Sequence, residues 1–278
     1  MELNWLESIL MGLLSGLGEI LPVSARAHSI VLLKVFGAED NSHVLDLLIH
    51  LAIFAAVYMS CQNQILRYLR ARHISRIPKK KRKRPLDTRA LMDFRMVRTM
   101  AIPVIFAFFF FERCQVIGDK AVWLSVMLFL NGVILYIPQF FPGSNKDCRT
   151  LTRLEGLLMG IGGAASVLPG ISGIGASLSI GSLCGVERTY ALSITLLMEL
   201  VVITGLIVFD IIGMVTVGLG VFSFLIFVKY LVSAVAAFTG AYLGIRILSA
   251  LAEEVGYSLF AYYCWGAALF AFILNLLA

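Results

Sequence analysis

Two short segments combine chemically versatile side chains with otherwise apolar sequence. In the first, the carboxylate of Glu19, the hydroxyl of Ser24, the guanidinium of Arg26 and the imidazole of His28 fall within ten residues. Such groups can bind an anion, hold a hard cation and transfer a proton. The second segment contributes glycines and hydroxyls that let a ligand approach the backbone, namely Gly170, Ser172, Gly173 and Ser177.

The composition excludes a water-soluble domain as the support for these residues. Of the 278 residues, 59% are hydrophobic and 14% are charged, whereas an ordinary soluble domain has about 25% charged residues. Lipid offers the backbone no hydrogen-bond partners, which excludes open sheets, and the alternating pattern of a membrane barrel is absent. We therefore predict an all-α polytopic membrane protein with a single membrane domain over residues 1–278.

Six apolar stretches approach or exceed the length of about 20 residues that a helix needs to cross a bilayer. The predicted crossings are 44–60, 97–112, 121–141, 190–210, 216–245 and 258–277. Between the first two, the segment 67–98 holds 13 Lys and Arg residues and two Asp residues. A basic run beside apolar spans is typical of a cytoplasmic loop rather than of a nucleic-acid site, so we expect no nucleic-acid partner.

Two further apolar segments, 5–37 and 154–185, are each interrupted by proline and small residues. If each segment crossed the bilayer once, its flanks would lie on opposite sides. If each dips in and returns, the positive-inside bias holds throughout the chain. We therefore predict two re-entrant helical hairpins, the first inserted from outside and the second from the cytoplasm.

A glycine pattern relates these two segments to one another. The pattern Gly-Leu-Leu-x-Gly-(Leu or Ile)-Gly begins at Gly12 and again at Gly156, and a proline follows each copy. The predicted fold is therefore six transmembrane helices plus two re-entrant hairpins in an inverted-topology repeat. Its halves span about 1–141 and 154–278.

Broken helices in inverted repeats meet near the bilayer midplane, where their N-termini offer N–H groups to an anion such as a phosphate or carboxylate. Glu19, Arg26 and His28 would be costly in hydrocarbon, so we predict that they line a polar pocket. In the alternative, Arg26 and His28 reach the outer interface and Glu19 pairs with Arg26. At the second bend, a tight helix crossing would explain the small residues equally well.

Two more charged residues, Glu199 and Lys229, fall inside predicted crossings. Antiparallel neighbouring helices would place them at similar depth, where an ion pair would relieve the cost of burying both charges. Alternatively, each side chain faces a water-filled groove by itself.

The segment Gly12–His28 reads Gly-x-x-x-Gly-x-x-Glu-x-Leu-Pro-Val-Ser-x-x-x-His, and Leu168–Ser172 reads Leu-Pro-Gly-x-Ser. Both resemble the undecaprenyl pyrophosphate phosphatase family of bacterial inner-membrane proteins, often called the bacitracin-resistance family. Weaker similarity extends over 185–191, 241–246 and 260–263. The resemblance implies six crossings plus two re-entrant hairpins. It also implies removal of the terminal phosphate from a polyprenyl diphosphate on the outer face, which recycles the lipid carrier of peptidoglycan sugars.

Three positions depart from the pattern of that family. Its first bend carries Glu-x-x-x-Glu, thought to hold a divalent cation such as Mg²⁺ or Ca²⁺, but here Ser15 replaces the first glutamate and only Glu19 remains. Its proposed nucleophilic serine is Ala25 here, and the arginine of its second bend is Gly173. The resemblance therefore implies a weakened cation site at Glu19.

The sequence contains residues that could compensate for these losses. Arg26 could supply the missing positive charge, and either Ser24 or a water activated by His28 could attack phosphorus. The candidate catalytic residues are therefore Ser24, His28 and Glu19, with Glu19 also the candidate metal ligand. The candidate substrate-binding residues are Arg26, Gly170, Ser172, Gly173 and Ser177.

Two classes of function fit these observations. One is a polyprenyl diphosphate phosphatase, and the other is a non-hydrolytic polyprenyl phosphate binding protein or flippase on the same scaffold. A carrier for an unrelated small anion is a third reading. The expected partners are a polyprenyl lipid and the membrane itself, and the glycine-rich spans are compatible with a homodimer.

Overall fold

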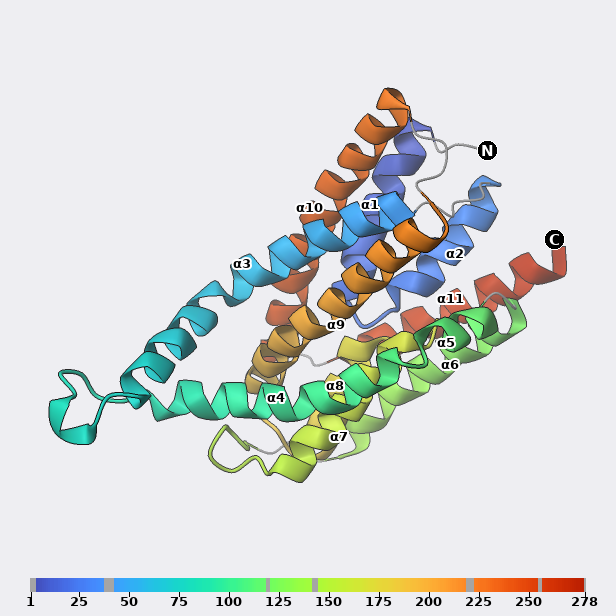
Figure 1. Ribbon diagram of the computed structural model, residues 1–278. Helices are drawn as coiled ribbons and strands as arrows, with labels where there is room; N and C mark the ends of the chain where they lie inside the picture. The colour runs from blue at the N-terminus through green and yellow to red at the C-terminus, as the bar shows by residue number, and fades with distance from the viewer. Residues whose placement is uncertain are drawn as a thin grey trace.

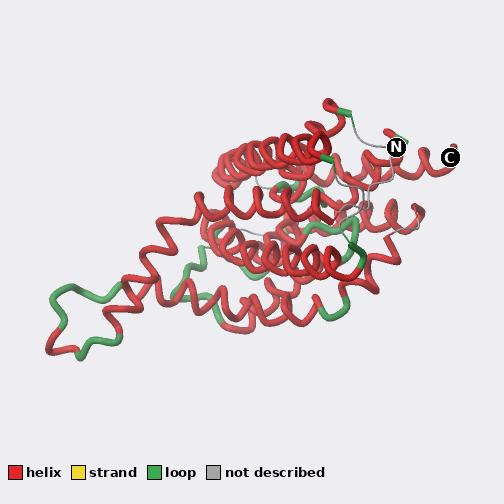
Figure 2. The backbone as a smooth tube through the Cα atoms, turned by 45° about the horizontal axis from the view of Figure 1, so that its top comes forward, coloured by secondary structure: helices red, strands yellow, loops and turns green. Residues whose placement is uncertain are grey.

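The computed structural model describes residues 4–37, 43–118, 121–141, 145–218, 223–254 and 257–277. The described elements are helices joined by short connections (Figures 1 and 2). In chain order they are α1 (Trp5–Ile20), α2 (Ala25–Phe36), α3 (His43–Ser75), η1 (Lys79–Lys81), α4 (Thr88–Phe108), α5 (Phe111–Gly118), α6 (Ala121–Tyr136), η2 (Ile137–Phe140), α7 (Arg153–Ala164), η3 (Ala165–Val167), α8 (Gly173–Leu183), α9 (Arg188–Thr216), α10 (Phe224–Glu254) and α11 (Leu259–Leu277).

Within the described ranges, five helical segments are long and apolar enough to cross a membrane, and they lie on α3, α6 with η2, α9, α10 and α11. Large apolar side chains such as Phe129, Val235 and Leu269 remain exposed on their outer faces. Such a surface suits lipid tails rather than water. The chain is therefore an all-α multi-pass membrane protein, which confirms the class that the composition predicts.

The boundaries of two predicted crossings are wrong. The crossing at 216–245 starts too early, because α9 continues to Thr216 and α10 begins at Phe224. Hydrophobicity alone could not locate this break, but Gly218 adopts a φ of 98°, a conformation that ends helices and that favours glycine. The crossing at 97–112 belongs mainly to α4, which ends at Phe108 before α5 begins.

The basic segment 67–98 is mostly helical, and the non-helical connection is shorter than expected. Helix α3 runs on to Ser75 and α4 starts at Thr88. The Asp87 side chain accepts a hydrogen bond from the N–H of Ala90 at 3.0 Å and pairs with Arg67 at 2.8 Å. This cap and ion pair join the two helix ends, and Tyr68 of α3 stacks on Phe94 of α4 beside them. Figure 1 shows the connection at the end of the molecule farthest from both termini.

Each interrupted segment forms two helices that pack against each other across a break. Helix α1 ends at Ile20 and α2 begins at Ala25, with Pro22 between them. Helix α7 ends at Ala164 and α8 begins at Gly173, after η3 and an irregular stretch. Proline lacks the N–H that a continuous helix needs, which accounts for the first break.

The repeated glycine pattern brings each first helix against a helix from the other half of the chain. Helix α1 packs on α10, and α7 packs on α4. A Cβ atom on Gly16 would lie 2.1 Å from the carbonyl oxygen of Ala237, and one on Gly160 would lie 2.4 Å from that of Met100. Any larger residue would push the backbones apart, so close helix crossing explains both copies of the pattern.

We expect Gly16→Ala to lower the free energy of unfolding in detergent micelles by about 1–3 kcal/mol, because the added methyl overpacks the contact between α1 and α10. The matched control is Gly266→Ala on α11, where an added Cβ meets nothing within 4 Å. Helix propensity then predicts a gain of up to about 1 kcal/mol. Equal effects of the two variants in denaturant titrations would contradict the close crossing.

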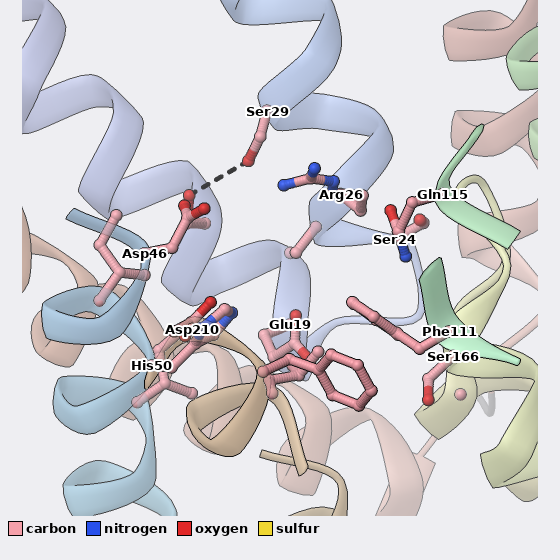
Figure 3. Close-up of a pocket in the computed structure, with 18 of the residues that line it drawn as sticks. Glu19, Ser24, Arg26, Ser29, Asp46, His50, Phe111, Gln115, Ser166 and Asp210 are labelled. Carbon is pink, nitrogen blue, oxygen red and sulfur yellow. Dashed lines mark hydrogen bonds and ion pairs between the residues drawn. The ribbon is translucent and has the colours of Figure 1, made fainter. Parts of the chain in front are cut away.

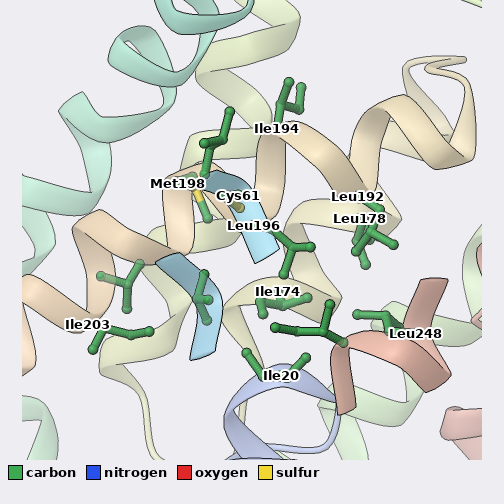
Figure 4. Close-up of a cluster of buried hydrophobic side chains, with 14 of the residues drawn as sticks. Ile20, Cys61, Ile174, Leu178, Leu192, Ile194, Leu196, Met198, Ile203 and Leu248 are labelled. Atoms are coloured by element: carbon green, nitrogen blue, oxygen red, sulfur yellow. The ribbon is translucent and has the colours of Figure 1, made fainter. Parts of the chain in front are cut away.

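A cluster of buried apolar side chains fixes the ends of the broken helices (Figure 4). Ile20, at the end of α1, and Ile174, at the start of α8, are 0% and 1% exposed. They belong to the same cluster as Met198 of α9 and Leu248 of α10. Because dense packing resists small shifts, the two breaks are held at fixed positions in the core of the protein.

Candidate active site

The two breaks meet inside the protein through hydrogen bonds. The N–H of Gly170 donates to Ser24 Oγ at 3.1 Å. Asn131 on α6 bridges both breaks, because its Oδ1 accepts from the N–H of Ser172 at 2.9 Å and its Nδ2 donates to the carbonyl of Pro22 at 3.0 Å. Buried backbone groups that a break removes from the helix ladder thus find partners in the opposite break and in α6.

Ser24 has an unusual backbone conformation. Its φ is 67°, and no other non-glycine residue in the described part of the chain has a positive φ. Such a conformation costs about 1–3 kcal/mol and is concentrated at functional sites. The carbonyl of Ser24 accepts a hydrogen bond from His28 Nδ1 at 2.7 Å, which helps to hold the strained turn.

A cavity of about 400 Å³ lies beside the two breaks and extends along α3, α5 and α9 (Figure 3). Five of the residues singled out from the sequence line it, namely Glu19, Ser24, Arg26, Ser172 and Gly173. Ser15 and Ala25, two of the positions that depart from the family pattern, line it as well. The residues come from both breaks, so neither segment forms the cavity alone.

Three predicted site residues, His28, Gly170 and Ser177, are not among the described residues that line this cavity. The imidazole of His28 stacks on Tyr263 of α11, and its Nε2 lies 2.8 Å from the Tyr263 hydroxyl oxygen. The hydroxyl of Ser177 lies 3.4 Å from that of Thr195. His28 is therefore placed to support the Ser24 turn, and Ser177 contributes to packing between α8 and α9.

Carboxylates dominate the charge inside the cavity. Glu199, which is 2% exposed, lies within hydrogen-bonding reach of Glu19. The hypothesised ion pair with Lys229 is not among the ion pairs that join described residues. The remaining acidic residues of the lining are Asp46, Glu112 and Asp210, and its basic residues are Arg26, His43 and His50.

A histidine and an aspartate from different helices are in direct contact in the cavity. His50 Nδ1 on α3 lies 2.6 Å from Asp210 Oδ2 on α9. The two side chains point toward each other in Figure 3. This pair connects the helix that follows the first broken segment with the helix that follows the second.

Sequence reasoning missed Asp46, His50, Asp210 and Asn131 as site residues. The signal was present, because all four lie within predicted crossings, where a polar or ionisable side chain is by default a candidate for function. The two breaks, by contrast, gather several polar residues within a few positions of the sequence. Single polar residues in long apolar helices are assigned to a site only once the helices are placed together.

The fold and the site define a class of protein: a helical membrane protein in which two broken helices meet at a polar, carboxylate-rich cavity. The family model described as "Bacitracin resistance protein BacA" matches residues 8–270. The chain belongs to this family. The match covers both broken helices, the cavity and nearly all of the remaining helices.

Several curated relatives are similar to this chain along almost their whole length. A protein of Methanobrevibacter smithii is 26% identical over 273 residues, covering 96% of each chain. One of Carboxydothermus hydrogenoformans is 26% identical, covering 95% of this chain and 94% of the relative. One of Methanococcus vannielii is 28% identical, covering 95% of this chain and 98% of the relative. All three carry the name undecaprenyl-diphosphatase.

Proposed function

We propose that this protein removes the terminal phosphate from a polyprenyl diphosphate, such as undecaprenyl diphosphate, and so recycles the lipid carrier of cell-wall sugars. Membership of the family and the shared name of the relatives support this function. The observation that carries it is the convergence of two helix N-termini and Arg26 on one cavity. This arrangement suits an anionic group better than a neutral one.

The anion-binding end of the cavity is built by the starts of α2 and α8. Ser24 and Ser172 precede these helices and line the cavity, and the positive ends of the helix dipoles lie there. The Ser172 hydroxyl caps α8 by accepting from the N–H of Gly175, whereas the Ser24 hydroxyl accepts from Gly170 and does not cap α2. The first N–H groups of α2 are therefore suited to phosphate oxygens, and Arg26 can add two parallel hydrogen bonds.

The apolar part of the cavity suits the beginning of an isoprenoid chain. Ile49 and Ile53 of α3, Phe111 of α5, and Leu206 and Phe209 of α9 line it together with the polar residues. A binding site with apolar walls and a few convergent polar groups orients an amphipathic ligand, with the charged end at the polar groups. The diphosphate would then lie at the breaks and the tail would run along α3 and α9.

In the proposed reaction the Ser24 hydroxyl attacks the terminal phosphorus. The bond from that phosphorus to the bridging oxygen breaks, and polyprenyl monophosphate leaves with the electron pair. The serine proton passes to a carboxylate of the cavity, for which Glu19 is the candidate. Water then hydrolyses the phosphoserine and releases inorganic phosphate, while Arg26 stabilises charge on the transferring group. His28 is a positioning residue that holds the Ser24 turn.

Glu19 and Glu199 are the residues that would hold a divalent cation such as Mg²⁺ or Ca²⁺. Their carboxyl groups lie within hydrogen-bonding reach of each other, and two carboxylates at that separation repel unless a proton or a cation lies between them. The donor set thus fits a hard cation, which takes oxygen ligands. Glu199 would supply the second carboxylate that Ser15 cannot. A bound cation would neutralise phosphate charge.

The proposed topology has six crossings and two re-entrant hairpins in an inverted repeat, with α4 as the sixth crossing. The packing of α1 on α10 and of α7 on α4 supports it, because each hairpin contacts a helix of the other half. Cavity residues lie near the start of α3, whereas the basic connection follows its end, about 50 Å away for a helix of 33 residues. With the basic connection in the cytoplasm, the cavity faces the outer side of a bacterial inner membrane.

The proposal is tested by measuring phosphate release from undecaprenyl diphosphate by the purified protein in lipid vesicles with Mg²⁺. We expect protein-dependent release of one phosphate per lipid, with the monophosphate as the other product and no release from undecaprenyl monophosphate. Release no faster than in vesicles without protein would overturn the proposal. Movement of the lipid phosphate between leaflets without hydrolysis would instead indicate a flippase.

A further inference from the structure

We infer that His43, Asp46 and Asp210 form a binding site for a divalent transition metal ion such as Zn²⁺ or Mn²⁺. One ligand atom of each residue lies within 4.8 Å of the other two. All three residues line the same cavity, away from the two breaks along α3 and α9. Small side-chain rotations would bring these atoms around one ion at bond lengths of about 2.0–2.2 Å.

The local structure of α3 and α9 builds this set of ligands. His43 and Asp46 are three residues apart near the start of α3, so their side chains share one face of that helix. Asp210 comes from the last part of α9, which packs against α3. The imidazole therefore meets one carboxylate from its own helix and one from a helix more than 160 residues away in the sequence.

Two observations besides the ligand cluster bear on this site. First, α9 leaves room for the imidazole at Gly213, where a Cβ atom would lie 2.5 Å from the His43 ring. Second, five of the described residues that line the cavity are acidic, and one of them, Glu199, is 2% exposed and lies beside the carboxyl group of Glu19. Apart from the pair of Glu19 and Glu199, the described lining sets three acidic side chains against Arg26 and two histidines, and a divalent ion would offset the charge of Asp46 and Asp210.

His50 would act as an outer-shell residue of this site. Its Nδ1 lies 2.6 Å from Asp210 Oδ2. Asp210 is 8% exposed, and this contact fixes the orientation of its carboxylate, leaving Oδ1 for an ion. Outer-shell partners of this kind orient metal ligands and commonly change metal affinity by about 10–100-fold.

The donor set indicates both the class of metal and its role. One imidazole and two carboxylates suit borderline ions such as Zn²⁺ and Mn²⁺ rather than an all-oxygen Ca²⁺ site. Three protein ligands leave a coordination position open, which is typical of sites that bind a substrate or water. The role of the metal rests on the proposed function: an oxygen of the diphosphate would occupy the open coordination position. The positive ion would then allow an acidic cavity to bind an anionic ligand.

The experiment uses the full-length protein in detergent, stripped of metal with a chelator and titrated with Co²⁺ as a visible-light probe. We expect one equivalent of Co²⁺ to produce an absorption band that Zn²⁺ removes by competition. His43→Gln should weaken Co²⁺ binding at least about 10-fold, and Asp210→Asn should do the same. His73→Gln is the matched control, because His73 is exposed near the far end of α3, away from the cavity. The His73→Gln variant should bind Co²⁺ as tightly as the native protein does.

The result that would overturn the inference is the absence of a stoichiometric Co²⁺ band, or a band that both His43→Gln and Asp210→Asn leave unchanged. Loss of the band in Glu19→Gln alone would assign the metal to the two glutamates instead. His43 is partly exposed at the start of its helix, so its variant should fold even if the Asp210 variant does not. A normal Co²⁺ site without phosphate release would overturn the proposed phosphatase and leave the metal site standing.

Discussion

Replacement of Arg26 by glutamine is expected to lower the rate of phosphate release from undecaprenyl diphosphate by about 10³-fold. Arg26 lines the cavity at the start of α2, and the described lining contains no other arginine or lysine. Glutamine keeps a polar side chain of similar reach but cannot neutralise charge on the transferring phosphoryl group. The measurement is the initial rate in vesicles at saturating lipid, so that the chemical step rather than binding is compared.

The matched control for this prediction is Arg70→Gln. Arg70 is an exposed arginine near the basic end of α3, far along that helix from the cavity. The control should retain the native rate, and lysine at position 26 should restore part of the loss because it returns the charge without the bidentate geometry. If Arg26→Gln and Arg70→Gln release phosphate equally fast, Arg26 does not contact the diphosphate.

Replacement of Asn131 by leucine is expected to lower the free energy of unfolding by about 2–5 kcal/mol, because it leaves buried polar groups without partners. Asn131 is 0% exposed, and its side chain accepts a hydrogen bond from the N–H of Ser172 and donates one to the carbonyl of Pro22. Leucine has a similar volume, so the loss measures the hydrogen bonds rather than a cavity. The two breaks should also separate, so the rate of phosphate release should fall together with stability.

The stability of this variant is measured by denaturant titration in detergent micelles, with Asn63→Leu as the control. Asn63 is exposed on α3, and its replacement should change the free energy of unfolding by no more than about 0.5 kcal/mol. A native-like unfolding curve for Asn131→Leu would mean that the two breaks are held together by apolar packing alone. In that case the bridge from α6 would not be what positions the site.

The sequence alone predicts the class of fold and the places where the helices break. Apolar composition excludes water-soluble folds, and lipid forces the backbone into helices, so the all-α membrane class follows from local chemistry. Pro22 likewise acts locally, by removing an N–H from the helix. The boundary between α9 and α10 was predicted too early in the chain, because apolar residues on both sides hide a turn at Gly218.

The composition of the cavity was decided only by the tertiary structure. Glu19, Ser24 and Arg26 could be nominated from their spacing, but the contact of Ser24 with Gly170 joins residues 146 positions apart. Spacing along the chain likewise could not show that His28 turns toward α11, or that Glu199 meets Glu19 rather than Lys229. The direction of a side chain depends on which helix faces it. That choice is made by the packing of α3, α9 and the two broken helices together, and no single segment contains it.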